Sequence, residues 1–324
     1  MQSCPASFFI FIKMKLSAIT ALTALGIALS FSASAQTRMS GAFTENFDAK
    51  SSEYFQYNAN DFRHFCGVPS LSQKGTDVML LRIDPKTPAG AGRGPELGTA
   101  ATTHFGSYSA RLRVPDVKDV QPNVGAVVGY FTYREDRNFG LSEIDVEFLI
   151  ADPRIIYIGA WTSTPGHIDQ LQRIGRTINL ATGHIYETIY RSFHDGNRNH
   201  PFTSEETTSP KTIRPIEGFD ASKRFYEYGF DWHSDRLTWW IIDPNNNEKI
   251  ILWDFRGTTP NFHGIPQPPT TYRLNFWHTN DWPVETNRKS TEAPAYPYIL
   301  EADYMSFTPF EEESRAWIEK NGWK

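Results

Sequence analysis

The residues with the clearest chemical potential are three acids at alternate positions in the segment 141–150. Glu143, Asp145 and Glu147 alternate there with isoleucine, valine and phenylalanine. Because side chains on a β-strand alternate between its two faces, the three acids share one face and the apolar residues share the other, which can enter a core. Adjacent carboxyl groups repel one another and cost stability, so three of them on one face call for a chemical role.

Paired carboxylates are the catalytic groups of glycoside hydrolysis, in which one acts as nucleophile and the other as acid and then base. On a straight strand the Cα atoms of Glu143 and Glu147 lie ~13 Å apart. Retaining enzymes place the two carboxyl groups ~5–5.5 Å apart and inverting enzymes ~6.5–9.5 Å apart. On a concave strand the two side chains can lean together. Asp145 lies between them and can share a proton with Glu143, and the combined negative charge should raise the proton affinity of Glu147.

Two other interpretations of the acidic segment remain open from the residues alone. The first is a solvent-facing acidic strand, although acids are depleted in strands. The second is a metal site, which an extended strand disfavours because it spreads the oxygen ligands too far apart. No histidine pair has metal-ligand spacing, and His184 opens a plain strand pattern.

The rest of the chain reads as short strands separated by turn residues, without long helical periodicity. This pattern favours an antiparallel sandwich or barrel. Three segments are expected as loops: 49–76, 84–98 and 191–216. The segment 310–320 is expected as a short amphipathic helix or a tail. Strands are expected at 41–48, 78–83, 107–114, 125–133, 141–150, 154–162, 184–190, 224–232, 236–243, 249–253, 271–278 and 299–307.

The amino terminus has the pattern of a secretory signal. Met14 and Lys15 precede an apolar run over 16–31, and small residues at 33–35 form a cleavage site before Gln36. The run is short for a membrane span and contains Thr, Ser and Gly. We therefore expect residues 1–35 to be a leader and signal peptide, 36–324 to be a single catalytic domain with a short tail, and the product to be secreted or periplasmic without membrane attachment.

The composition of the chain limits the classes of ligand that it is expected to bind. The 324 residues carry 32 Lys and Arg against 37 Asp and Glu, a net charge of −5, which disfavours nucleic acid and polyanionic polysaccharide as ligands. Cys4 lies in the leader, so the mature chain keeps only Cys66, expected as a buried small hydrophobe without a disulfide. A monomer is expected.

The segment 143–149, EIDVEFL, resembles the signature of glycoside hydrolase family 16 in the form without an extra residue between the Asp and the second Glu. That form is typical of bacterial β-1,3-1,4-glucanases (lichenases) and of xyloglucan transglycosylases. The resemblance covers about residues 42–308. It implies an all-β jelly-roll sandwich of two antiparallel sheets with a concave substrate cleft. It also implies a retaining mechanism with Glu143 as nucleophile, Asp145 as its helper and Glu147 as acid/base.

The resemblance further implies a set of substrate-binding residues and no cofactor for the chemistry. Asn275 and Trp277 share one face of their strand by period two, and a sugar ring can stack on the indole while the amide binds hydroxyl groups. Some relatives bind a structural Ca²⁺, whose ligands cannot be identified in this sequence. The implied binding residues are Glu96, Phe131, Tyr133, Trp161, Asn275, Trp277 and Trp282. The aromatic residues of 226–232 and 239–240 are expected in the core of the convex sheet.

Four positions depart from the lichenase pattern. Leu141 and Ser142 replace a Trp and an Asp, while Gly98 and Gly159 stand where lichenases have an Arg and an Asn. The catalytic strand thus follows the family, whereas its surroundings differ. The leading hypothesis is a secreted, retaining endo-β-glucanase acting on a neutral β-glucan. The alternatives are a transglycosylase on the same scaffold and a non-catalytic, lectin-like glycan-binding protein.

Overall fold

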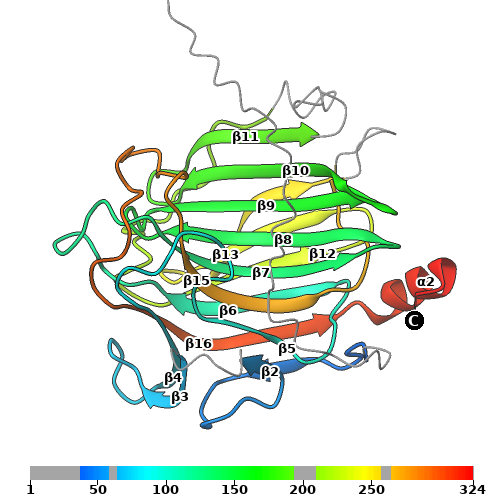
Figure 1. Cartoon of the computed structure of the whole chain (residues 1–324), viewed down its shortest axis with the longest axis horizontal. Coiled ribbons are helices and arrows are strands. Elements are labelled where there is room, and N and C mark those ends of the chain that lie inside the picture. Colours follow the sequence, from blue (N-terminus) through cyan, green and yellow to red (C-terminus); the bar gives the residue numbers. More distant parts are fainter. Residues whose placement is uncertain (1–36, 58–63, 193–208, 257–263, 324) are drawn as a thin grey trace, which may run out of the picture. The chain divides into compact units, whose positions relative to one another are not determined.

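The computed structural model describes residues 37–57, 64–192, 209–256 and 264–323, and strands dominate these ranges (Figure 1). In this described part of the chain the strands form two eight-stranded sheets in which every pairing of strands is antiparallel. The predicted all-β jelly-roll sandwich is confirmed. We call the two layers the cleft sheet and the outer sheet.

The cleft sheet has the order β11-β10-β9-β8-β7-β15-β5-β2, with the acidic strand β8 in its interior. Its strands are β2 (Phe55–Tyr57), β5 (Glu96–Thr99), β7 (Ala126–Asp136), β8 (Gly140–Leu149), β9 (Ile155–Thr164), β10 (His167–Asn179), β11 (His184–Ser192) and β15 (Thr271–His278).

The outer sheet has the order β14-β13-β12-β6-β16-β4-β3, and β1 also pairs with β16. Its strands are β1 (Phe43–Glu45), β3 (His64–Pro69), β4 (Asp77–Ile83), β6 (Gly106–Arg113), β12 (Tyr226–Trp232), β13 (Leu237–Asp243), β14 (Glu248–Phe255) and β16 (Tyr298–Pro309).

The two sheets enclose one large apolar core rich in aromatic rings. Tyr108 and Phe230 of the outer sheet stack at a centroid distance of 4.7 Å, and Tyr130 of the cleft sheet lies 5.6 Å from Phe230. Trp232 and Trp239 are fully buried. The prediction that the aromatic residues of the β12–β13 hairpin belong to the core is therefore confirmed. Large flat side chains suit this position because they fill the gap of about 10 Å between packed sheets.

The segment 49–76 is the main place where the predicted loop assignment is wrong. It contains β2 and β3, which lie at the outer edges of their respective sheets. The alternation of apolar and polar residues is hidden there by polar residues and by Gly67, whose φ of +59° lies in the left-handed region. Strand β3 also has a register shift between Phe65 and Val68. Pairing with a neighbouring strand supplies the order that the local sequence does not signal.

Smaller corrections concern strand ends. The first strand is shorter than predicted, β7 continues to Asp136, and β5 takes the end of the predicted loop 84–98. Of the predicted loop 191–216, β11 includes the first two residues, and 193–208 lie outside the described residues. Cys66 is buried as expected, against the hydroxyl of Tyr57.

The predicted tail helix is present as α2 (Glu311–Asn321), which ends at Gly322 in the left-handed conformation. Trp317 packs edge-on against His104 and lies 5.8 Å from Phe139, the residue before β8. Arg38 holds the start of the helix through Glu311 at 2.5 Å. The helix thus packs beside the turn that leads into the acidic strand. The predicted signal peptide lies outside the described residues, and among those described no helix has the length and apolarity that a membrane crossing requires.

Candidate active site

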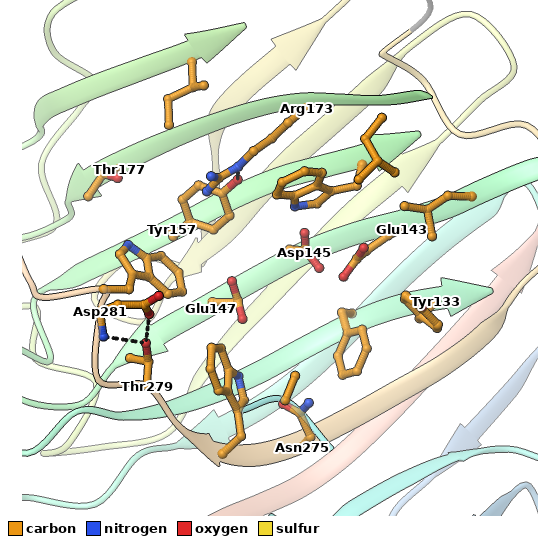
Figure 2. Close-up of a pocket in the computed structure, with 18 of the residues that line it drawn as sticks. Tyr133, Glu143, Asp145, Glu147, Tyr157, Arg173, Thr177, Asn275, Thr279 and Asp281 are labelled. Carbon is orange, nitrogen blue, oxygen red and sulfur yellow. Dashed lines mark hydrogen bonds between the residues drawn. The ribbon is translucent and has the colours of Figure 1, made fainter. Parts of the chain in front are cut away.

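The acidic strand β8 has the two-faced arrangement that its sequence predicts. Ile144, Val146 and Phe148 are buried in the core between the sheets. Glu143, Asp145 and Glu147 project from the opposite face and line a cleft of about 1020 Å³ (Figure 2). Asp145 is only 4% exposed, and the two glutamates flanking it are half-buried.

The cleft crosses the strands instead of following one of them. Its lining extends from Glu96 on β5 to Arg191 on β11, so it spans seven strands of the cleft sheet. At about 4.8 Å between strands this corresponds to roughly 29 Å. An elongated groove of this size suits the internal segment of an extended polymer better than a single small molecule.

Strand register divides the lining of the cleft into three rows, one for each acid. In the first row Glu143 lies between Tyr133 and Trp161. In the second, Asp145 lies between Phe131 and Gly159. In the third, Glu147 lies between Gly129 and Tyr157, and Asn275 follows Gly129. The acids therefore occupy the middle of the groove and not one of its ends.

The structure brings the sequence-predicted residues together in this one cleft. Beside the three acids, the lining includes Glu96, Phe131, Tyr133, Trp161, Asn275, Trp277 and Trp282. Glu96 and Asn275 are cross-strand partners, and Trp277 donates a hydrogen bond to the carboxylate of Glu147. The binding roles of these residues stay predictions.

Burial gives the acids unusual proton affinities. It raises the pKa of Glu147 to about 7, while Arg173 and the Trp277 hydrogen bond act in the opposite direction. Burial and the nearby charge of Glu147 raise the pKa of Glu143 to about 8. The pKa of Asp145 is raised by burial and by both glutamates. The predicted increase for Glu147 is found, but burial causes it, and charge repulsion acts instead on Glu143 and Asp145.

The higher pKa falls on Glu143, the residue that the resemblance makes the nucleophile. The two glutamates interact strongly, so they release their protons as a pair. The roles of nucleophile and acid/base are assigned from the position of each residue in the motif and stay a prediction.

The cleft residues that the sequence analysis missed include Tyr157, Arg173 and Arg273. Arg173 belongs to β10, a strand that was not predicted because its core face carries the polar Gln172 and Arg176 among isoleucines. The Arg176 guanidinium is buried over the ring of Trp253, a partner that the local sequence cannot reveal. The regular placement of Ile174 and Ile178 was the available signal.

Two of the departures from the lichenase pattern have a spatial explanation. Gly98 lies opposite Arg273, and a Cβ atom at Gly98 would lie 3.4 Å from the Arg273 Cγ. A Cβ atom at Gly159 would clash with the Tyr157 hydroxyl. In each case a long side chain from a neighbouring position occupies the space above the glycine.

The other two departures differ in their exposure to the cleft. The side chain of Ser142 is completely buried on the core face and does not line the cleft. Leu141 does line it, beyond Glu143. The substitution at position 142 is thus remote from a substrate, whereas the substitution at position 141 changes the cleft wall.

Among the described residues no group of three or more His, Cys, Asp or Glu side chains is arranged to hold a metal ion. The three acids of β8 thus lie as a row along the strand and not as a cluster around a point.

Comparison with known proteins gives consistent relatives at low identity. The chain is 24% identical over 285 residues to the Brevibacillus brevis protein "Beta-glucanase", covering 84% of each chain. It is 22% identical over 268 residues to the Bacillus licheniformis "Beta-glucanase", covering 79% of this chain and 83% of the relative. No family model matches the chain.

Among solved structures, a Bacteroides ovatus GH16 protein in complex with a G4G4G3G product aligns with a TM-score of 0.51 and 11% identity, over 82% of this chain and 99% of that one. This likeness shows the shared fold. The solved Bacillus licheniformis beta-glucanase aligns with a TM-score of 0.45 and 18% identity over 83% of this chain.

A jelly-roll sandwich whose cleft sheet carries a row of carboxyl groups amid aromatic rings defines a glycosidase-type scaffold. The predicted resemblance of this chain to glycoside hydrolase family 16, in its bacterial lichenase-like form, is confirmed by the curated relatives and by the fold.

Proposed function

We propose that this protein is a retaining endo-β-glucanase. The observation that carries the proposal is the row of three carboxyl groups on β8, which project into the middle of an open, aromatic-lined groove. The curated relatives named beta-glucanase agree with the predicted enzyme class, glycoside hydrolase, and with β-glucan as the substrate class.

The proposed reaction proceeds in two displacements on one sugar ring. The carboxylate of Glu143 attacks the anomeric carbon, while the protonated Glu147 gives its proton to the leaving oxygen. Glu147 then removes a proton from a water molecule. The oxygen of that water attacks the anomeric carbon and displaces the carboxylate of Glu143. Asp145, whose pKa is raised by burial and by both glutamates, stays protonated beside Glu143 and donates a hydrogen bond to its carboxylate. The high pKa that burial gives Glu147 suits a group that must hold a proton near neutral pH.

No cofactor takes part in this proposal because two carboxyl groups supply both the nucleophile and the proton. A structural Ca²⁺, known from some relatives, would act on stability alone. Adding EDTA is therefore expected to leave the rate unchanged, and a drop in melting temperature on EDTA addition would reveal such an ion.

The linkage of the glucan is part of the proposal. The form of the acidic motif favours a mixed β-1,3-1,4-glucan, while Arg273 and Tyr157 fill space above Gly98 and Gly159 on either side of Asp145. These two side chains give the cleft its own shape around the acids. We expect them to modify which linkages fit.

A polysaccharide panel tests the substrate. Purified protein is incubated with barley glucan, laminarin, xyloglucan and agarose, and reducing ends and product linkages are measured. Barley glucan is expected to be cut internally, with an early fall in viscosity. Release of no reducing ends from any β-glucan would contradict the proposal. Products longer than the substrate, formed only when an acceptor oligosaccharide is added, would show the transglycosylase alternative.

Rescue with azide tests the two roles. A Glu143→Ala variant supplied with azide is expected to form an α-glycosyl azide, because the anion attacks from the side that the nucleophile has left. A Glu147→Ala variant is expected to form the β-anomer from the glycosyl-enzyme. The same anomer from both variants would contradict the assignment of roles.

Secretion and a monomeric state complete the proposal. The apolar run over 16–31 and the small residues before Gln36 support export. Sequencing of the mature amino terminus is expected to begin at Gln36, and light scattering is expected to give the mass of one chain.

A further inference from the structure

Arg173 is a cleft residue to which the acidic motif assigns no role. It lines the cleft from β10, in the Glu143 row, with Trp161 between them. Two strand spacings therefore separate its backbone from that of Glu143, about 9.6 Å. The side chain of an arginine is long enough to cover much of that distance.

The contacts of the Arg173 side chain show where its guanidinium lies. The Nε atom donates a hydrogen bond of 3.0 Å to the hydroxyl oxygen of Tyr157, which belongs to the Glu147 row (Figure 2). That hydroxyl lies over Gly159 and Gly175, since a Cβ atom at either glycine would clash with it. Gly159 is the registered neighbour of Asp145. The guanidinium thus runs from the Glu143 row toward the Glu147 row, beside the middle acid.

Aromatic rings hold this cation in place. Its Cζ atom lies 4.9 Å from the ring centroid of Trp161 and 5.1 Å from that of Tyr157. Trp282 then packs edge-on against Tyr157 at 5.2 Å and fixes that ring in turn. A guanidinium fixed between two rings and a hydroxyl keeps its charge at a defined place, whereas a free side chain would move into solvent.

We propose that Arg173 is a positioning residue that tunes the ionisation of the catalytic carboxyl groups. This inference rests on the proposed function of the same cleft. A fixed positive charge beside the three acids favours their ionised forms, so it counteracts the effect of burial. The charge of Arg173 thus lets one carboxyl group act as a nucleophile near neutral pH. Arg173 itself does not contact the reacting atoms of the substrate in this proposal.

Other charged groups also face the acids and must be compared with Arg173. Arg273 on β15 is 2.6 Å from Glu96, and Arg191 on β11 is 3.8 Å from Glu187. Arg288 pairs with Glu285 at 2.6 Å in the loop after β15. The remaining acids of the lining are Glu135 on β7, which accepts a hydrogen bond from Tyr133, and Asp281, which accepts one from Thr279. Among the described residues, Arg173 differs from the other three arginines of the lining because its side chain contacts Tyr157 and aromatic rings, whereas each of the others pairs with a carboxylate.

The test is the pH profile of kcat/KM for three variants. Arg173→Met removes the charge and keeps the length of the side chain. Arg173→Lys keeps the charge. Arg191→Met is the matched control, since it removes a cation from the same row, one strand farther from the acids.

Arg173→Met is expected to move both limbs of the profile toward alkaline pH by roughly one unit. This is the size expected for a unit charge on the order of 10 Å away at an effective dielectric of about 20. Arg173→Lys is expected to stay within a few tenths of the wild type, and Arg191→Met is expected to shift the limbs less than Arg173→Met, because Arg191 is one strand farther from the acids and its side chain is 38% exposed to solvent. Unchanged limbs in Arg173→Met, with only a lower rate, would overturn the inference, and so would an equal shift in Arg173→Lys.

A measurement without turnover separates this inference from the proposed function. The side-chain carboxyl carbons of Glu143 and Glu147 are followed by ¹³C NMR during a pH titration of the wild type and of Arg173→Gln, with melting temperature as a check on folding. Higher midpoints in the variant support the inference even if no β-glucan is cut, in which case only the proposed function fails. Identical midpoints in the two proteins overturn the inference.

Discussion

The indole nitrogen of Trp239 donates a hydrogen bond of 3.1 Å to the backbone carbonyl of Asp145, across the interior of the sandwich. Trp239 belongs to β13 in the outer sheet and is fully buried. The middle acid of the row on β8 is therefore held from behind by the opposite sheet, at the backbone and not at its carboxyl group. This link couples the packing of the core to the geometry of the cleft.

Replacing Trp239 by Phe should destabilise the protein and reduce catalysis. Loss of the hydrogen bond and of part of the ring is expected to cost about 1–3 kcal/mol. It should also lower kcat several-fold, because the backbone of β8 loses its support at Asp145. Trp232→Phe is the matched control, since Trp232 is equally buried but donates to the carbonyl of Pro266. Equal effects of both variants on kcat would contradict a specific role of Trp239.

Glu143 and Glu147 should reduce the stability of the fold at alkaline pH. Burial raises the folded-state pKa of Glu147 to about 7 and that of Glu143, with help from Glu147, to about 8. The folded state thus binds more protons than the unfolded state between about pH 4.5 and 8, so stability is lost as pH rises through that window.

Glu147→Gln and Glu143→Gln are therefore expected to raise the melting temperature by a few degrees at pH 8 and much less at pH 5 while abolishing turnover. Glu53→Gln, at an exposed position, serves as the control and should change neither value. A lower melting temperature at pH 8 in both active-site variants would show that the carboxylates are well stabilised in the fold.

The glycine pair under Tyr157 offers a way to disturb the cleft without changing a charge. Gly159 and Gly175 are cross-strand partners, and a Cβ atom at Gly175 would clash with the Tyr157 ring and hydroxyl. Gly175→Ala should displace that ring and lower kcat/KM about tenfold or more. Gly98→Ala is the control, because its Cβ atom would meet the Arg273 side chain at 3.4 Å, which is close to ordinary contact. A kcat/KM close to wild type in Gly175→Ala would show that activity does not depend on the position of the Tyr157 ring.

The ion pair between Arg273 and Glu96 should matter for binding more than for chemistry. The two side chains meet at 2.6 Å, and the guanidinium also lies 5.3 Å from the ring centroid of Tyr133. Arg273→Met is expected to raise KM for the preferred glucan several-fold with a smaller effect on kcat, because it frees two predicted binding side chains. Arg82→Met, which removes an exposed pair with Asp84, is the control. An effect confined to kcat would place Arg273 in the chemical step instead.

The acidic strand and its immediate neighbours could be predicted because their information is local. Alternation over 141–150 fixed which face of β8 carries the acids, and β7, β9 and β15 showed similarly clear patterns. The edge strands β2 and β3 could not be predicted, since their order comes from pairing with β5 and β4. Strand β10 escaped notice because Arg176 is buried against Trp253, a contact between residues far apart in sequence.

The side chains that fill the cleft around the acids were likewise beyond the reach of sequence patterns. Tyr157 is buried at 2% exposure and looked like any core tyrosine, yet register places it beside Glu147. Arg273 was passed over although its strand was predicted, because nothing in the sequence shows that it reaches Glu96. Such assignments depend on cross-strand neighbours, which the sequence alone does not list.

In the proposed function, the residues that carry out the reaction and the residues that select the substrate come from different strands. The three acids proposed to carry out the reaction all come from β8, whereas most of the side chains that line the groove beside them come from β5, β7, β9, β10 and β15. We therefore expect mutations in those flanking strands to change which sugars bind and to leave the three acids of β8 in place. A laboratory search for altered preference should accordingly randomise positions such as 98, 159 and 273 and leave the central strand untouched.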